Sequence, residues 1–151
     1  MSILRPRDKE RDILEARETV AICSPGINRD KVQWLASLAA RPIARSVRIV
    51  VFTLPPADYP EEYQAKADAH IQRLRQLAID VVPMQGLHEH LAIIDQNAVW
   101  YGSVNILSRS KENDIIIRLE DSQMSRDLSL HLGKLANGSG QEQGLLPLPV
   151  L

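Results

Sequence analysis

The sequence predicts one α/β domain built on a mixed β-sheet with helices on both faces. Segments with helical periodicity alternate with short runs of β-branched residues, in the order helix, strand, helix, strand, helix, several strands and a final helix. The chain has 151 residues, 44% of them hydrophobic and 25% charged, which suits a single core of ordinary size. No internal repeat divides it.

The expected elements of the first half are separated by residues that break them. Proline, glycine and a cap-forming asparagine stand between the apolar runs, at Ser24-Pro25-Gly26, Asn28 and Pro55-Pro56. The periodicity predicts a charged helix at 8–18, a buried strand at 19–23, a helix after Asn28, a strand at 46–54 and a long helix at 60–78.

The second half is richer in strands and ends in a helix. We expect strands at 79–84, 88–95, 99–104 and 114–119, with a hairpin-like turn at Gln96-Asn97. Asp121 or Ser122 caps the last helix, whose apolar positions are Met124, Leu128, Leu132 and Leu135. From Gly138 the periodicity is lost, so we expect a domain at 1–137 and a tail or truncated linker at 138–151.

Charge, cysteine content and hydropathy narrow the class of protein. The net charge of −1 argues against coating nucleic acid by bulk electrostatics, so any phosphate must bind at a local site. The one cysteine, Cys23, excludes an internal disulfide and suits a reducing compartment. No signal peptide and no apolar run of about 20 residues is visible. We therefore expect a cytoplasmic protein without a membrane partner.

The most informative stretch places several chemically active side chains at fixed spacing. It is written H-x-H-x4-D-x6-G-S-x-N and comprises His88, His90, Asp95, Gly102, Ser103 and Asn105. On a strand, residues two apart point to the same side, so His88 and His90 would share one cleft. Paired imidazoles can bind phosphate when charged, attack it when neutral, or ligate a metal ion.

Two alternatives to a phosphate-processing site remain open at this point. The histidines could be ordinary polar residues at the start of a strand. They could also begin a zinc site with Asp95 as a third ligand, although the metallo-β-lactamase pattern would need Asp and His where Ala92 and Ile93 stand. The two remaining histidines, His70 and His131, lie on predicted helices.

The stretch resembles the H-x-K-x4-D-x6-G-S-x-N signature of the phospholipase D superfamily, with His90 in place of the family's lysine. The resemblance covers roughly residues 14–135 and is sharp from 88 to 105. It implies a mixed, largely parallel β-sheet flanked by helices, with Ile22-Cys23-Ser24-Pro25 as a first strand and turn that end near the active site. It implies no metal and no cofactor.

The resemblance also implies roles for individual residues. His88 would attack phosphorus and form a phosphohistidine, or act as general acid in a partner copy. Ser103 and Asn105 would donate hydrogen bonds to the phosphoryl oxygens, and Asp95 would orient the motif. Glu112 would support the histidine, with Asp114 as a rival for that role. The expected substrate contacts are Ser24, Arg109 and Lys111.

His90 is the departure from the signature. An imidazole with an ordinary pKa of ~6.5 is mostly neutral at pH 7, whereas lysine is a permanent cation there. A bound phosphate dianion would favour the charged imidazole. Three outcomes are compatible with the substitution. The protein could be a slower enzyme that prefers acidic pH, a binding domain that has lost catalysis, or a substituted copy of the domain that traps an inactive state.

Because the chain carries one motif and the chemistry needs two histidines, the resemblance implies a homodimer.

The residues around the motif resemble domains attached to bacterial helicases and other DNA-processing ATPases, which implies a DNA endonuclease, with DNA preferred to RNA. A helicase or ATPase module would lie elsewhere or in a partner chain, since no P-loop is present here. The alternative is a catalytically degenerate module that binds nucleic acid or dimerises. Trp100 and Tyr101 could stack on bases, but we expect at least one of them in the core.

Overall fold

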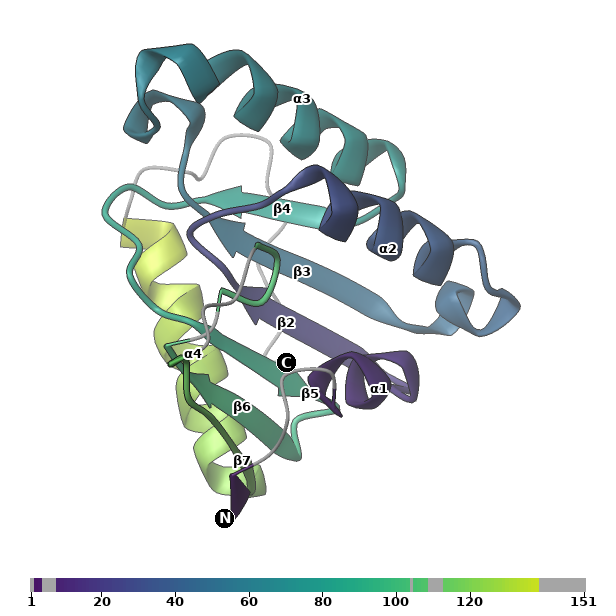
Figure 1. The fold of residues 1–151 in the computed structure, drawn as a ribbon. Coiled ribbons are helices and arrows are strands. Elements are labelled where there is room, and N and C mark those ends of the chain that lie inside the picture. The colour runs from purple at the N-terminus through teal and green to yellow at the C-terminus, as the bar shows by residue number, and fades with distance from the viewer. Residues whose placement is uncertain (1, 4–7, 104, 109–112, 139–151) are drawn as a thin grey trace.

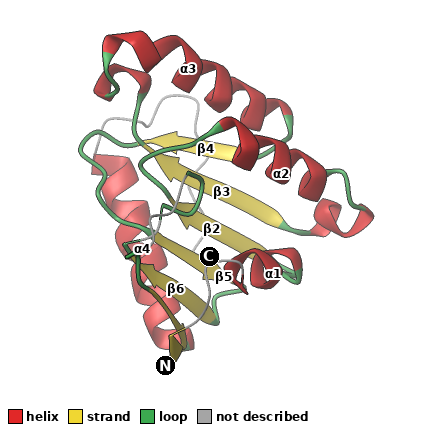
Figure 2. Cartoon of the chain, in the orientation of Figure 1, coloured by secondary structure: helices red, strands yellow, loops and turns green. Residues whose placement is uncertain are grey.

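The computed structural model describes residues 2–3, 8–103, 105–108 and 113–138. The predicted α/β architecture is confirmed, because a seven-stranded sheet carries helices on both faces (Figure 1). Helices α1 (Asp8–Leu14), α2 (Arg29–Ala39) and α3 (Glu61–Gln76) pack on one face, and α4 (Ser122–Gly138) packs on the other. Figure 2 shows the same layers coloured by secondary structure.

The order of the strands across the sheet is β1-β7-β6-β5-β2-β3-β4. Their bounds are β1 Ser2–Ile3, β2 Thr19–Cys23, β3 Arg48–Thr53, β4 Asp80–Pro83, β5 Leu91–Ile94, β6 Ala98–Gly102 and β7 Ile116–Glu120. Strands β2, β3 and β4 pair in parallel, whereas the other neighbouring pairs are antiparallel, so that only β5 and β7 run against the rest.

The connections explain this mixture of directions. Parallel neighbours need a long crossover, which α2 and α3 supply between β2 and β4. The antiparallel pair β5–β6 needs only a tight turn, and Asp95 and Gln96 adopt positive φ angles of 52° and 53° there. Asn97 N donates to Ile94 O at 3.0 Å, which closes a turn of the type that favours hairpins.

Alternate residues of the central strands face two separate core layers. In β2, Val20 and Ile22 pack toward α1, α2 and α3, whereas Ala21 and Cys23 pack toward α4. This alternation is the one expected for a strand covered on both faces. The same alternation places Ser24, the residue directly after β2, on the face of the sheet that Ile22 occupies.

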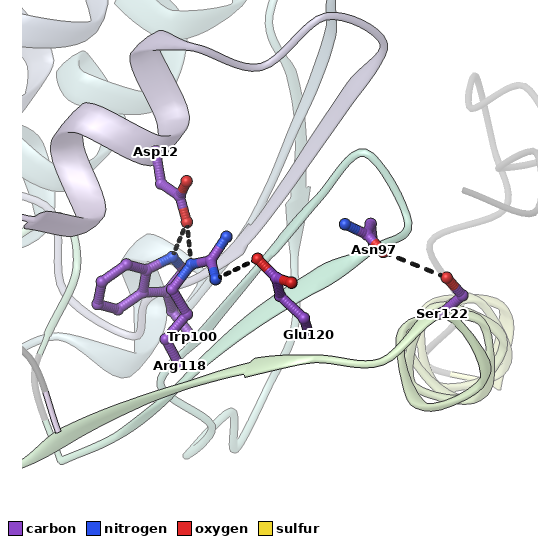
Figure 3. A network of polar contacts seen from close by, with 6 residues as sticks. All are labelled: Asp12, Asn97, Trp100, Arg118, Glu120 and Ser122. Carbon is purple, nitrogen blue, oxygen red and sulfur yellow. Dashed lines mark hydrogen bonds and ion pairs between the residues drawn. The ribbon is translucent and has the colours of Figure 1, made fainter. Parts of the chain in front are cut away.

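A polar network attaches α1 to the antiparallel part of the sheet (Figure 3). Asp12 Oδ2 accepts hydrogen bonds from Trp100 Nε1 and Arg118 Nε, both at 2.6 Å. Arg118 also pairs with Glu120, and the hydrogen bond to Asp12 is the first cause that raises the pKa of Arg118. Trp100 is buried, as expected for at least one of the two neighbouring aromatic residues, whereas Tyr101 is exposed.

Two expected boundaries differ by three residues or more from the structure, and one short strand was not expected. The first helix ends at Leu14 rather than at residue 18, because the backbone of residues 17–19 binds the Asp95 carboxylate instead. The strand expected from His88 begins only at Leu91. Strand β1, two residues long, was not predicted because two residues carry no periodicity.

The last helix buries two serines together with part of its apolar pattern, since Leu132 is buried and Leu128 packs against the core. Asp121 caps it, since its Oδ1 accepts from Met124 N at 2.9 Å. The buried positions are Ser125, Ser129, Leu132 and Ala136, whereas Met124 and Leu135 are exposed. The two serines can be buried because their hydroxyls donate to carbonyl oxygens one turn earlier, at 2.8 Å each.

Candidate active site

The motif residues gather at the edge of the sheet where β2 and β6 end and β5 begins. Cys23 pairs with Leu91 in the antiparallel register, so Ser24 and His90 leave the ladder side by side. Gly102 N donates to His90 O at 3.2 Å, which brings the end of β6 to the same place. Three segments that are distant in sequence therefore meet beside His90.

The two motif histidines lie in the loop before β5, so the expectation that both stand on a strand is wrong. His88 is exposed and His90 is partly buried. Glu89 Oε2 accepts from the backbone N–H of His88 at 3.1 Å, a hydrogen bond within the loop itself. An exposed imidazole on a loop next to a rigid sheet edge is accessible to a substrate.

One nitrogen of His90 is buried without a hydrogen-bond partner. Among the described residues, its Nδ1 is the one buried side-chain nitrogen or oxygen in this condition. A buried polar atom without a partner costs free energy, so such atoms usually mark a place for water, an ion or a ligand. His90 therefore offers a hydrogen-bonding atom that the described protein does not use.

Ser103 is held by two residues that directly precede β7. Its Oγ donates to Asp114 Oδ1 and accepts from Ile115 N, both at 3.0 Å, and its N–H donates to Ile115 O at 2.9 Å. Of the two acidic candidates for supporting the site, the structure places Asp114 on Ser103. Glu112, Arg109 and Lys111 lie outside the described residues.

Gly102 lets the chain approach the start of β7 this closely. A Cβ on Gly102 would lie 2.0 Å from Ile115 O and 2.8 Å from Ile116 Cα. Both neighbours are backbone atoms, so no side-chain rotation relieves the clash. The glycine of the motif thus sets the distance between β6 and β7 beside Ser103.

Replacing Gly102 by alanine is expected to displace the motif serine and destabilise the fold. The backbone must move apart, and we expect a loss of about 1–3 kcal/mol in the free energy of unfolding. Urea denaturation measures that loss, and the Gly133→Ala variant is the control, because a Cβ there meets nothing within 4 Å. A Gly102→Ala protein as stable as the control would contradict the expectation.

Asn105 joins the loop after β6 to the end of β2. Its Oδ1 lies 3.3 Å from Ser24 Oγ and 3.5 Å from Gly26 N. The single hydroxyl hydrogen of Ser24 is shared between Asn105 Oδ1 and Gly26 O, which lies 2.7 Å from Ser24 Oγ, and the same oxygen accepts from Leu107 N at 3.1 Å. These bonds orient the Asn105 amide so that its Nδ2 is left to donate elsewhere.

Ser24, a predicted substrate contact, is 0% exposed, and its hydroxyl is used within the protein. In this structure it supports the Asn105 amide, and its contact with substrate stays a prediction.

The carbonyl of Pro25 is supported by residues that sequence reasoning missed. Thr53 Oγ1 and Tyr59 OH donate to it at 3.1 Å and 2.8 Å. Burial raises the pKa of the Tyr59 hydroxyl, which keeps it a neutral donor. Tyr59 follows the Pro55-Pro56 turn, and no spacing rule could have linked it to Pro25.

Asp95, which the motif lists with the catalytic residues, is not brought together with them. It follows β5 at the opposite end from His90, and its carboxylate accepts from the backbone N–H groups of Glu18 at 2.7 Å, Thr19 at 3.0 Å and Arg17 at 3.0 Å. The same position removes Asp95 as a third ligand in the metal interpretation. The described residues contain no group of three His, Cys, Asp or Glu side chains that could hold a metal ion.

Asp95→Ala is expected to lower stability without altering the chemistry of folded molecules. The three amide donors lose a charged acceptor, which should cost about 2–3 kcal/mol in the free energy of unfolding. Thermal denaturation measures the cost, and Asp95→Asn, which keeps one oxygen, should lose less. Equal stability of Asp95→Ala and the unchanged protein would show that these bonds contribute nothing.

Residues 10–135 match the family model described as "Cardiolipin synthase, PLD-like domain". The chain belongs to the phospholipase D superfamily. A comparison with curated proteins by sequence gives no match.

Several solved structures share the fold of this chain. NucT from Helicobacter pylori has a TM-score of 0.67 at 18% identity, covering 90% of this chain and 93% of that one. The phospholipase D family member Nuc from Salmonella typhimurium has a TM-score of 0.65 at 13% identity, with coverages of 84% and 83%. TrmBL2, an archaeal chromatin protein whose structure shows a mode of DNA binding, has a TM-score of 0.57 at 11% identity, with coverages of 93% and 52%.

Within the part of this phospholipase D-like chain that the structure describes, no helix is long and apolar enough to cross a lipid bilayer.

Proposed function

We propose that this chain is a metal-independent phosphodiesterase that cleaves DNA as a homodimer through a phosphohistidine. The observation that carries the proposal is the convergence of His88, His90, Ser103 and Asn105 at one end of the sheet, beside the ends of β2 and β6. TrmBL2, a chromatin protein, shares the fold, which supports DNA as the substrate to test first.

The proposed reaction has two displacement steps. In the first, a neutral imidazole nitrogen of His88 attacks phosphorus, a P–N bond forms and the P–O bond to the leaving group breaks. His88 of the other copy gives its proton to the leaving oxygen. In the second, that histidine removes a proton from water, the resulting oxygen attacks phosphorus, and the P–N bond breaks to return His88 to its starting state.

The remaining residues act on the negative charge that develops on the phosphoryl oxygens. Asn105 Nδ2 is a donor on an amide whose oxygen Ser24 and Gly26 hold, so little reorganisation is needed when substrate binds. The Ser103 hydroxyl donates to Asp114 in this structure and can turn to a phosphoryl oxygen. His90 takes the lysine's position and adds charge only when it is protonated.

A second candidate is a phospholipase D-like module that binds nucleic acid or dimerises without cleaving. The observation that favours it is His90 itself, because the signature's permanent cation is missing from this place.

The two candidates separate in one assay. Supercoiled plasmid, single-stranded DNA and RNA are incubated with the full chain in excess EDTA, and retention on native gels is measured in parallel. Cleavage that survives the chelator supports the phosphodiesterase, and the substrate cut fastest identifies the nucleic acid. Binding without cleavage supports the module. Cleavage that disappears with EDTA would overturn the metal-independent proposal.

A further inference from the structure

A tight turn after β6 has apolar residues in its middle and a polar residue at each end. Ser108 N donates to Asn105 O at 3.4 Å, which closes the turn. Ile106 and Leu107 lie between these two residues and are buried in the core. Because the apolar pair holds the turn in the core, Asn105 and Ser108 are left at its partly exposed ends.

The turn is fixed to the segment between β2 and α2. Leu107 N donates to Ser24 Oγ at 3.1 Å, and Asn28 N, at the cap of α2, donates to Leu107 O at 2.8 Å. Ser24 leaves the ladder between β2 and β5 beside His90. The turn therefore lies at the same edge of the sheet as His90.

Gly26 leaves a recess between this turn and the end of β2. A Cβ on Gly26 would lie 3.9 Å from Asn105 Nδ2 and 3.6 Å from Ser108 Oγ, both ordinary contact distances. Gly26 is not among the residues with a positive φ angle. Neither the backbone conformation nor a clash therefore requires glycine here, and what glycine provides is open space beside two hydrogen-bond donors.

Both donors are available to a ligand in the recess. The Asn105 oxygen faces Ser24 Oγ and Gly26 N, which are donors, so its Nδ2 group is directed away from them. Within the part of the chain that the structure describes, the Ser108 hydroxyl has no hydrogen-bond partner. A ligand oxygen about 1 Å closer to either donor than the missing Cβ would be at hydrogen-bond distance.

We propose that this recess binds the non-bridging oxygens of the scissile phosphodiester, with Ser108 Oγ as a second donor beside Asn105 Nδ2. The inference rests on the proposed function, which brings phosphorus to His88 at this edge of the sheet. Ser108 stands outside the signature that contains Asn105. Helix α2 begins at Arg29, three residues after Gly26, and the positive end of its dipole favours an anion nearby.

Ser108→Ala removes the proposed donor and tests its contribution to catalysis. We expect kcat/KM for DNA cleavage to fall on the order of 10-fold or more, the size of one hydrogen bond to a charged group. Ser37→Ala is the matched control, because Ser37 is an exposed serine of α2 whose hydroxyl donates to the Gln33 carbonyl one turn earlier. Thermal melting checks that both variants are folded.

Ser108→Cys separates hydrogen bonding from packing. The thiol has nearly the volume of the hydroxyl but is a weak donor, so this variant should be about as slow as Ser108→Ala. A cysteine variant as fast as the unchanged protein would show that the side chain only fills space, and would overturn its role as a donor.

Gly26→Ala fills the recess without creating a clash. Its methyl group would be in ordinary contact with both donors, so the melting temperature should stay close to that of the unchanged protein. The phosphoryl oxygens would lose their place, and kcat/KM should fall by at least the factor lost in Ser108→Ala. Gly133→Ala is the control, since a Cβ there meets nothing within 4 Å. If Gly26→Ala melts much earlier, the two Ser108 variants decide.

DNA affinity, measured in the His88→Gln background so that no substrate is consumed, separates this inference from the proposed function. If the unchanged protein binds DNA but never cleaves it, the proposed function fails. A several-fold rise in the dissociation constant from Ser108→Ala, absent in Ser37→Ala, then still supports the recess, and no rise overturns it.

The other outcomes concern a protein that cleaves DNA. A Ser108→Ala protein equal to its control in both rate and affinity would overturn the recess and leave the proposed function in place. A loss of rate, with the controls unchanged, supports the two together. An unchanged protein that neither binds nor cleaves DNA would overturn both.

Discussion

His88→Gln is expected to abolish DNA cleavage while leaving DNA binding and dimerisation in place. His88 is exposed on the loop before β5, so the change removes the nucleophile and no packing. Without it neither the P–N bond nor the protonation of the leaving oxygen is available, and the cleavage rate should fall by at least about 10³-fold. Cleavage of labelled DNA in EDTA measures the rate, and gel retention checks that the substrate still binds.

Mixing the two proteins tests whether one active centre uses both copies of His88. After subunit exchange at a 1:1 ratio, random pairing leaves roughly one quarter of the dimers with two histidines. A centre shared by both copies then gives about a quarter of the unmixed activity at equal total protein, whereas independent centres give about half. A value of half would contradict the shared centre, and full activity of His88→Gln would remove the nucleophile altogether.

His90→Lys is expected to raise the rate of cleavage, most of all at alkaline pH. An imidazole is cationic only at acidic pH, whereas lysine keeps its charge throughout the range of the assay. If the bound phosphodiester requires this cation, cleavage by the unchanged protein should be slower at alkaline than at acidic pH. The lysine variant should be about 10- to 100-fold faster at pH 8, the size expected for one charged contact to the transition state.

The control for this prediction is His90→Gln, which is neutral at every pH. It should be slow at pH 5.5 as well as at pH 8, so the difference between the histidine and glutamine proteins should exist only at acidic pH. A flat pH profile for the unchanged protein, together with no gain from lysine, would show that the charge at position 90 does not matter. In that case the unpaired Nδ1 would need a neutral partner, such as a water molecule or a substrate hydroxyl.

Much of the fold could be predicted from local patterns. The buried strand at Thr19–Cys23, the cap at Asn28 and the long helix after Pro60 were each indicated by residues within a few positions of the element itself. Such elements depend on periodicity, on proline and glycine, and on hydrogen bonds that close within one turn.

The ends of elements were less predictable. No proline or glycine separates His88 and His90 from the apolar residues of β5, and only the pairing partners of β5 decide where the strand begins.

The roles of individual motif residues depended on contacts that no local pattern contains. Ser24 and Asn105 are 81 positions apart, and their contact makes Ser24 a support for the amide. Asp95 binds backbone groups 76 to 78 positions away, at the far end of β5. The apolar pattern of α4 indicated only part of its buried side, because buried serines satisfied by their own helix escape any hydropathy scale.

The sequence by itself determined the superfamily, most of the order of helices and strands and the identity of the candidate site residues, because fixed spacing and short-range periodicity are written directly in the chain. The tertiary structure alone decided which of those side chains meet. It placed Ser103 on Asp114, oriented Asn105 through Ser24, moved Asp95 to the opposite end of β5 and left Met124 and Leu135 of α4 exposed. The physical reason is that these contacts follow from strand pairing and layer packing over long sequence distances, where many arrangements share the same local pattern.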